Sequence, residues 1–220
     1  MPTSVTHGTL ADGSLEEINA TPEGRLEVDA DFSGLQSDAF DRLRVSFPFT
    51  LFDSSHRFSD NGFWATSTAS SGTATFNSNQ GLVDLAVTAA SGSEVLRETK
   101  RVFAYQPGKS LFVMSTFVFA TAKTNLRQRV GYFGVDNGLY VELDGTTLNL
   151  VLRSRVSGSV VNTVVPQSAW NQDTLNGSGK SGKTIDLTKV QFFWMDFEWL
   201  GAGSVRAGFL IDGKFIDRKS

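Results

Sequence analysis

The fold is decided by the segment QFFWMDFEW, residues 191–199. Successive side chains of a β-strand point to opposite faces of its sheet, so positions two apart share a face. From residue 193 the odd-numbered positions are Phe, Met, Phe and Trp, a uniformly apolar set that suits a core. The even-numbered positions mix two large rings with two acids, Asp196 and Glu198. We therefore predict a strand with one face in the core and the other at least partly exposed to water.

The same strand pattern recurs along the chain from residue 63 onward. Runs rich in β-branched and aromatic residues lie at residues 63–68, 73–77, 82–88, 95–105, 110–119, 127–135, 139–143, 147–156, 160–165, 190–200, 205–211 and 214–216. Asn-Gly at 137–138 and Asp-Gly at 144–145 and 212–213 separate such runs and favour tight hairpin turns, because these residues tolerate a positive φ. No window of a dozen residues shows a helical period. Residues 61–220 are therefore predicted to form an all-β domain, an antiparallel β-sandwich of the jelly-roll kind.

Residues 1–35 have the pattern of a separate N-terminal unit. Two short alternating runs, residues 14–18 and 25–30, are joined by a segment with Pro22 and Gly24 that suits a turn, which predicts a β-hairpin. A single hairpin is only marginally stable in water, so it needs support from the body or from a neighbouring subunit. We expect an attachment arm, followed by a Phe-rich connector at residues 36–60. The apolar side chains expected to make its assembly contacts are Leu10, Leu15, Ile18, Leu26 and Val28.

The composition narrows the classes of function. The chain has 220 residues, of which 40% are hydrophobic, enough to bury a core. Its net charge of -3 gives no overall positive field for nucleic acid, and no apolar run reaches the roughly 20 residues of a membrane helix. The absence of cysteine excludes disulfides, thiolate metal sites and a cysteine nucleophile. The first residues lack the pattern of a secretory signal, and we expect no membrane insertion and no nucleic-acid partner.

One stretch matches a nucleotide-binding motif in its letters. GSGKSGKT, residues 177–184, satisfies the phosphate-loop pattern G-x-x-x-x-G-K-[ST]. That chemistry needs a buried strand before the loop and a helix after it, whose N-terminal amides hold the phosphate. Here a polar segment precedes the motif and another predicted strand follows it. We therefore interpret the stretch as a Gly- and Ser-rich surface loop and expect no cofactor.

Few residues are available for catalysis. Asp196 and Glu198 are two carboxylates on one strand face, as in the acid/base and nucleophile pairs of glycosidases. Adjacent acids on a wet sheet face are common in proteins without activity, so a glycosidase is a distant third interpretation. His7 and His56 are the only histidines and lack the spacing of metal ligands or the companions of a Ser-His-Asp triad. We predict no catalytic residue and no metal site.

The tryptophans suggest a second interpretation, a carbohydrate-binding module for adhesion to a host. Large rings on a β-sandwich can stack on sugars, and the candidates are Trp170, Trp194 and Trp199. We expect residues 170–184 to form an outward-facing loop, which would present Trp170 to a glycan on the host surface.

Three segments of the chain resemble structural proteins of tailed phages, notably those of phages that infect marine cyanobacteria. They are HGTLADGSLEEI with TPEGRLEV (residues 7–18 and 21–28), DAFDRLRVS with PFTLFD (38–46 and 48–53), and FFWMDFEWLG with VRAGF and DGKFI (192–201, 205–209 and 212–216). These segments bracket the rest of the chain.

The resemblance implies a virion component with a short N-terminal attachment arm and a jelly-roll-like body, and it transfers no catalytic residue. We expect a non-enzymatic tail appendage, fibre or capsid-decoration subunit that contacts other virion proteins. We expect it to form a homo-oligomer, with a trimer favoured. Similar proteins tend to continue beyond the DGK hairpin at residues 212–214, so a neighbouring copy is expected to supply a final strand.

Overall fold

The computed structural model describes residues 7–9, 15–17, 49–106, 109–198 and 205–219. These residues form β-strands joined by turns, with one short 3-10 helix, η1 (Gln167–Ala169). Every strand pairing among them is antiparallel. The prediction of an all-β, antiparallel sandwich is confirmed.

The strands are numbered in chain order. They are β1 (His7–Thr9), β2 (Leu15–Glu17), β3 (Trp64–Ala69), β4 (Thr73–Asn77), β5 (Leu82–Ala86), β6 (Glu94–Thr99), β7 (Leu111–Phe117), β8 (Arg127–Phe133), β9 (Gly138–Asp144), β10 (Thr147–Ser154), β11 (Val161–Pro166), β12 (Gln191–Phe197), β13 (Val205–Ile211) and β14 (Lys214–Lys219).

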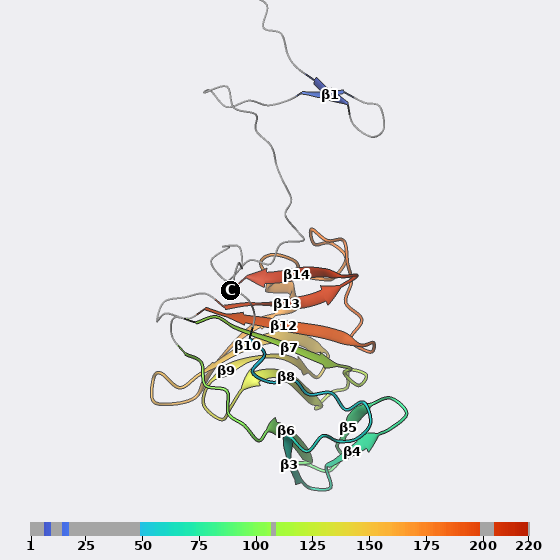
Figure 1. Cartoon of the computed structure of the whole chain (residues 1–220), viewed down its shortest axis with the longest axis vertical. Coiled ribbons are helices and arrows are strands. Elements are labelled where there is room, and N and C mark those ends of the chain that lie inside the picture. The colour runs from blue at the N-terminus through green and yellow to red at the C-terminus, as the bar shows by residue number, and fades with distance from the viewer. Residues whose placement is uncertain (1–6, 10–14, 18–48, 107–108, 199–204, 220) are drawn as a thin grey trace, which may run out of the picture.

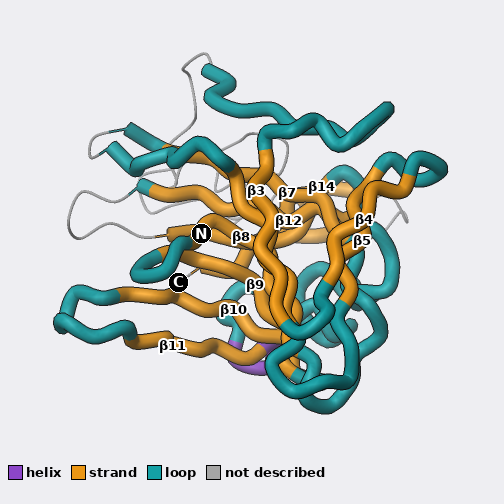
Figure 2. The backbone as a smooth tube through the Cα atoms, turned by 90° about the horizontal axis from the view of Figure 1, so that it is seen from below, coloured by secondary structure: helices purple, strands orange, loops and turns teal. Residues whose placement is uncertain are grey.

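Two four-stranded sheets make up the body of the protein. One has the strand order β11-β10-β9-β8 and the other has the order β14-β13-β12-β7. The two sheets pack against each other, because buried side chains from both belong to one hydrophobic cluster (Figure 1). The two-stranded sheets β3-β6 and β4-β5 lie beyond β8, at the bottom of Figure 1. Figure 2 shows β8, β9, β10 and β11 side by side in the first of the large sheets.

The strand β12 supplies the core as its alternation predicts. Phe193 and Met195 are fully buried and Phe197 nearly so. Phe209 of β13 packs against Phe193, with 5.3 Å between the ring centres. The buried apolar side chains that the opposite sheet contributes to this cluster are Leu139, Val141, Leu143, Leu148 and Leu150. Residues of β12 and β13 thus meet those of β9 and β10 in one core.

Hairpin turns fall at the predicted Asp-Gly and Asn-Gly pairs. Gly145, between β9 and β10, has a positive φ, as do both Asp212 and Gly213, between β13 and β14. Gly138 is required for a second reason, since a Cβ there would lie 2.3 Å from the Cα of Phe133 on the neighbouring strand. At these three turns, the residue types therefore determine where the chain reverses direction and which residues of the two flanking strands pair.

The other face of β12 departs from the prediction of a partly wet surface. Trp194 is only 3% exposed and Asp196 only 2% exposed. Phe112 of β7 and Phe215 of β14 cover the Trp194 ring, with ring centres 6.2 and 5.7 Å away. Side chains from neighbouring strands close over the middle of this face, which the pattern of one strand cannot reveal. Phe192, at the start of β12, stays exposed.

The N-terminal strands pair differently from the prediction. β2 falls within the predicted run at residues 14–18, but its partner is β1. A three-residue strand with Gly8 at its centre carries too little alternation to be recognised in the sequence. The second predicted run, residues 25–30, lies outside the described residues, as do residues 36–48 of the connector.

Replacement of Phe193 by alanine should lower the free energy of unfolding by about 3–5 kcal/mol, because it removes buried apolar surface and leaves a cavity. Phe58→Ala is the matched control, since Phe58 is 88% exposed and its truncation should cost less than about 0.5 kcal/mol. Denaturant unfolding of both variants measures the difference. An equal loss of stability in the two would contradict the packing described.

Candidate functional site

The Gly-rich stretch at residues 177–184 wraps around a carboxylate of the protein itself. The buried side chain of Asp173 accepts hydrogen bonds from the backbone N–H groups of Leu175 (2.8 Å) and Ser181 (2.7 Å). Gly179 passes so close that a Cβ there would lie 2.1 Å from Asp173 Oδ1. Burial alone raises the pKa of Asp173, but these hydrogen bonds and one from the Ser181 hydroxyl outweigh it and hold the pKa below its usual value. The loop therefore closes on an internal anion.

The structure around this loop also differs from that around a phosphate loop. Thr184 forms a β-bridge with Asn176, and the N–H of Gly177 donates to the carbonyl of Lys183. Within residues 185–190 no helix follows, so no helix N-terminus faces the loop. The ammonium group of Lys183 pairs with Asp212 in the β13–β14 turn at 2.8 Å. The stretch is a loop, as predicted, but one that is tied down at several points.

Two of the three tryptophans considered for sugar stacking are buried. Trp170 is 6% exposed, and its ring stacks on Phe209 with 6.2 Å between the ring centres. Its indole N–H donates to the carbonyl of Val165. The expectation of an outward-facing Trp170 is wrong, because an indole fills the core well once one carbonyl satisfies its N–H. Trp194 is covered as described above, and Trp199 lies outside the described residues, so neither Trp170 nor Trp194 offers a free ring face to a glycan.

The two acids considered for catalysis, Asp196 and Glu198, differ in their burial. Asp196 is buried and lies opposite Arg206 of β13 and Phe112 of β7 in the strand register. Glu198, just after the strand, is half-buried. Among the described residues, no group of three or more His, Asp or Glu side chains is placed to hold a metal ion. A sugar substrate has no access to Asp196 in this arrangement.

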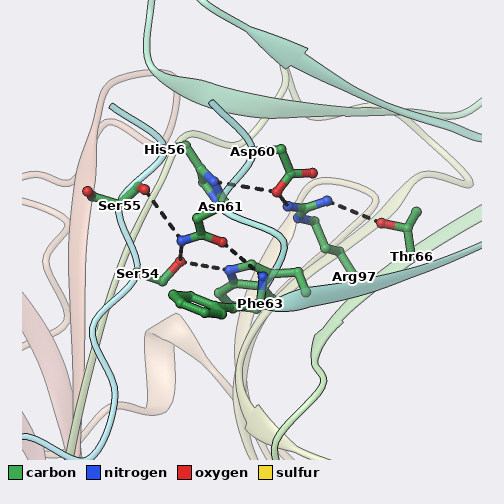
Figure 3. A network of polar contacts seen from close by, with 9 residues as sticks. Ser54, Ser55, His56, Asp60, Asn61, Phe63, Thr66 and Arg97 are labelled. Atoms are coloured by element: carbon green, nitrogen blue, oxygen red, sulfur yellow. Dashed lines mark hydrogen bonds and ion pairs between the residues drawn. The ribbon is translucent and has the colours of Figure 1, made fainter. Parts of the chain in front are cut away.

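A polar network ties the segment before β3 to the β3-β6 sheet (Figure 3). The hydroxyl oxygen of Ser54 accepts hydrogen bonds from the Trp64 indole at 2.8 Å and from the Asn61 amide at 2.5 Å. Arg97 of β6 donates to Asp60 at 2.5 Å. This hydrogen bond lowers the pKa of Asp60 from its usual value. The network anchors the chain that enters the body.

His56 lies in the same network without forming a catalytic triad. Its Nδ1 is 3.8 Å from Asp60 Oδ1, which is beyond hydrogen-bond distance. Ser54 already accepts from two donors, so its oxygen is held as an acceptor rather than as a nucleophile. The other histidine, His7, lies in β1 opposite Glu17 in the strand register.

An open hollow adjoins this network. It has a volume of about 350 Å³ and is lined by Leu51, Phe52, Asp53, Gly62, Phe63, Lys100 and Arg101. The volume is at the lower end of the range for ligand pockets. Its charged residues, Asp53, Lys100 and Arg101, are all exposed and of both signs. No buried polar group among the lining residues selects a ligand, so the hollow defines no particular chemistry.

The outer face of the β14-β13-β12-β7 sheet presents several large apolar side chains to solvent. Phe112 and Met114 of β7, Phe192 of β12 and Phe215 of β14 are each 38–45% exposed. We call these four residues the outer apolar face. In the strand register Phe192 lies opposite Leu210, which in turn lies opposite Phe215. Met114 of β7 lies opposite Trp194, so apolar side chains are present on all four strands. The exposed side chains that flank it, beyond the Gln191–Phe117 pair, are Val118 and Val190.

The rings of the outer apolar face are held in place by the side chain of Trp194. Trp194 fills the space beneath Phe112 and Phe215, and the guanidinium of Arg206 lies 5.8 Å from the centre of its ring. Rings held by such contacts lose little conformational freedom when a partner covers them, which favours binding. The sequence carried a signal for this face, because residues 111–117 are apolar at most positions on both faces of one strand. Residues 110–119 were predicted only as a strand, with neither face assigned to the core or to the surface.

The arm residues expected to mediate assembly are placed only in part. Leu15 lies in β2. The others, Leu10, Ile18, Leu26 and Val28, lie outside the described residues. Their assembly role stays a prediction.

Comparison with known proteins identifies no relative. No protein-family model, no curated protein and no solved structure matches the chain. Within the described residues, no helix has the length and apolar character needed to cross a membrane. What this chain does is therefore inferred from its own sequence and surfaces.

Replacement of Gly179 by alanine should lower the free energy of unfolding by about 1–3 kcal/mol, because the new methyl group would overlap the Asp173 carboxylate. Gly134→Ala is the control, since a Cβ at that position meets nothing within 4 Å and should cost less than about 0.5 kcal/mol. Thermal unfolding of both variants compares them. Equal stability would show that the loop does not close on Asp173.

Acidification should loosen the loop around Asp173. Since the pKa of this carboxyl is lowered in the folded state, its stabilising effect is complete above the unfolded pKa of about 3.9 and is lost as the pH falls through the folded pKa. Hydrogen exchange of the Ser181 amide, followed from about pH 6 downward with correction for intrinsic exchange, measures the opening. Asp173→Asn should abolish this pH dependence and Asp186→Asn should leave it unchanged. A Ser181 amide whose protection is the same at every pH would contradict the arrangement.

Proposed function

We propose that this chain is a non-enzymatic structural subunit that assembles with other proteins, and that the assembly is a tailed-phage virion. The outer apolar face carries the first part of this proposal. Contiguous apolar surface is uncommon on monomeric proteins, and where it occurs it often marks a contact with another protein. Covering Phe112, Met114, Phe192 and Phe215 would remove apolar area from water at roughly 25 cal/mol per Å².

The second part of the proposal, the virion, is supported by resemblance. The segment FFWMDFEWLG with VRAGF and DGKFI resembles phage structural proteins, and its strands β12, β13 and β14 belong to the sheet that carries the outer apolar face. The role would be that of a tail appendage, a fibre or a capsid-decoration subunit. Such subunits work as homo-oligomers held by protein–protein contacts, which is what an exposed apolar sheet face provides.

The N-terminal arm is proposed to dock on another virion protein. Its strands β1 and β2 pair with each other in a two-stranded sheet. A two-stranded unit gains stability by adding to the sheet of a partner, where its backbone groups complete further hydrogen bonds. Attachment through the arm and contact through the body would then be separate functions of the chain.

The two alternatives, a carbohydrate-binding module and a glycosidase, have less support than assembly. Trp170 and Trp194 are buried, which removes two of the three rings proposed for stacking on a host glycan. Asp196 is buried beside Arg206 in the register instead of lining a substrate cleft. No observation on the described residues favours either function over assembly.

The variant Phe192→Glu tests the role of the outer apolar face. It places a charge within that face, so self-association or incorporation into particles should weaken by about 30-fold or more, the effect of a contact worth about 2 kcal/mol. Sedimentation velocity over a range of protein concentrations measures association. Quantification of the protein in purified particles measures incorporation.

Val135→Glu provides the control. Val135 lies in the β8–β9 turn, away from the outer apolar face, and is 82% exposed, so the same charge is added to an accessible apolar residue at the end of the other sheet. We expect the control to assemble like the unmodified protein, with circular dichroism showing both variants folded. Full assembly of Phe192→Glu would refute the role of the outer apolar face.

A further inference from the structure

The strand β11 is the outermost strand of its sheet (Figure 2). Its one strand partner among the described residues is β10. On its other side no described strand satisfies its backbone N–H and C=O groups by pairing. Such an edge is a template for pairing with a strand from another chain.

β11 has few of the features that protect natural edges from pairing. Its sequence VNTVVP contains no charged residue, and its proline stands at the last position. Val161 and Val164 are 52% and 51% exposed. Protected edges commonly carry lysine, a bulge or an internal proline. Four of its six residues, the three valines and Thr163, are instead of types that favour β-strands.

The other outermost strands of the sandwich differ from β11. β14 carries charged residues along its length, namely Lys214, Asp217, Arg218 and Lys219. β8 carries Arg127 and Arg129, which pair with acids of β9. β7 is uncharged, but it lies next to β8 at the side of the sandwich. Within the described part of the chain, β11 is the sandwich edge that is both open and uncharged.

We propose that β11 pairs antiparallel with β11 of a second copy, about a two-fold axis at Asn162. The strand ends at Pro166, which has no N–H to donate, and the Val165 carbonyl already accepts a hydrogen bond from the Trp170 indole, so we place the pairing on residues Val160 to Val164, centred on Asn162. The axis places Val161 opposite Thr163 and Val160 opposite Val164. Each such pair lies on one face of the sheet, because the paired positions are an even number of residues apart. The two β8–β11 sheets then form one continuous sheet across the dimer.

A second copy suits this edge for a physical reason. Two identical strands brought together by a two-fold axis place like residues near one another, which is unfavourable when the residues are charged. β11 has no charge, so its self-pairing carries no such repulsion. The outer apolar face lies on the other sheet, so this contact does not depend on the proposed function. The proposed β11 pairing joins two copies, whereas the resemblance led us to expect a trimer.

Single cysteines along β11 test the register directly, because the natural chain contains none. Opposite residues of paired antiparallel strands have Cβ atoms about 4.5–5.5 Å apart, within reach of a disulfide after small adjustments or of a short bis-maleimide. Asn162→Cys should therefore form covalent dimers under mild oxidation. Cysteine at Val161 or Thr163 is displaced from its copy by about 7 Å along the strand and should crosslink about tenfold less.

A charged variant tests the contact without crosslinking. In Val161→Glu/Thr163→Glu, four carboxylates meet across the joint, and the dimer dissociation constant should rise by about tenfold or more. Val156→Glu/Ser159→Glu is the matched control, since it adds the same charge to the exposed β10–β11 turn outside the paired stretch. Circular dichroism checks that both variants fold, and analytical ultracentrifugation measures association.

The outcomes separate this proposal from the proposed function. Crosslinking at Asn162 that persists in the Phe192→Glu background supports edge pairing whether or not the outer apolar face assembles. A protein that associates but shows no preferred crosslinking position along β11 overturns the edge pairing alone. A protein that stays monomeric at millimolar concentration also overturns it.

Discussion

The structure depends on the packing of one strand, β12, between its neighbours and the opposite sheet. Phe193, Met195 and Phe197 are buried on the inner face, where the cluster of Leu and Val side chains from β9 and β10 meets them. Both large sheets contribute to this cluster, and each alone would expose an apolar face to water. Loss of the contact would leave two separate sheets, so the positions of the Asp173 loop, the outer apolar face and the β11 edge all follow from it.

The sequence predicted the parts of the fold that follow from local rules. Alternation identified the strands of the sandwich, and the Asp-Gly and Asn-Gly pairs located hairpin turns, because both signals lie within a few neighbouring residues. The burial of Trp170 and Trp194 was not predictable in this way, since it depends on Phe209, Phe112 and Phe215 from other strands. The polar residues of the 177–184 stretch also gave no indication that this loop closes around Asp173. Contacts between distant segments decided each of these cases.

The two faces of the β14-β13-β12-β7 sheet have different roles. The inner face is covered by the second sheet and holds the fold together. The outer face leaves Phe112, Met114, Phe192 and Phe215 in contact with water, over a layer fixed by Trp194. An exposed apolar surface of that kind is unfavourable in a monomeric protein, because it promotes aggregation. In a subunit of a larger particle, the same surface provides a contact with a neighbour. Catalytic residues, by contrast, need an accessible cleft, which Asp196 lacks.

The polar network around Ser54 determines how the body responds to tension on the chain that precedes it. A force applied on the N-terminal side of residue 49 is resisted first by the hydrogen bonds of Asn61 and Trp64 to Ser54 and by the Arg97–Asp60 pair, at the beginning of β3. β3 in turn is held to β6 by a ladder of paired residues. These bonds and the peripheral β3-β6 sheet therefore come earlier along the chain than the strands around β12, and they would be the first contacts to bear such a load.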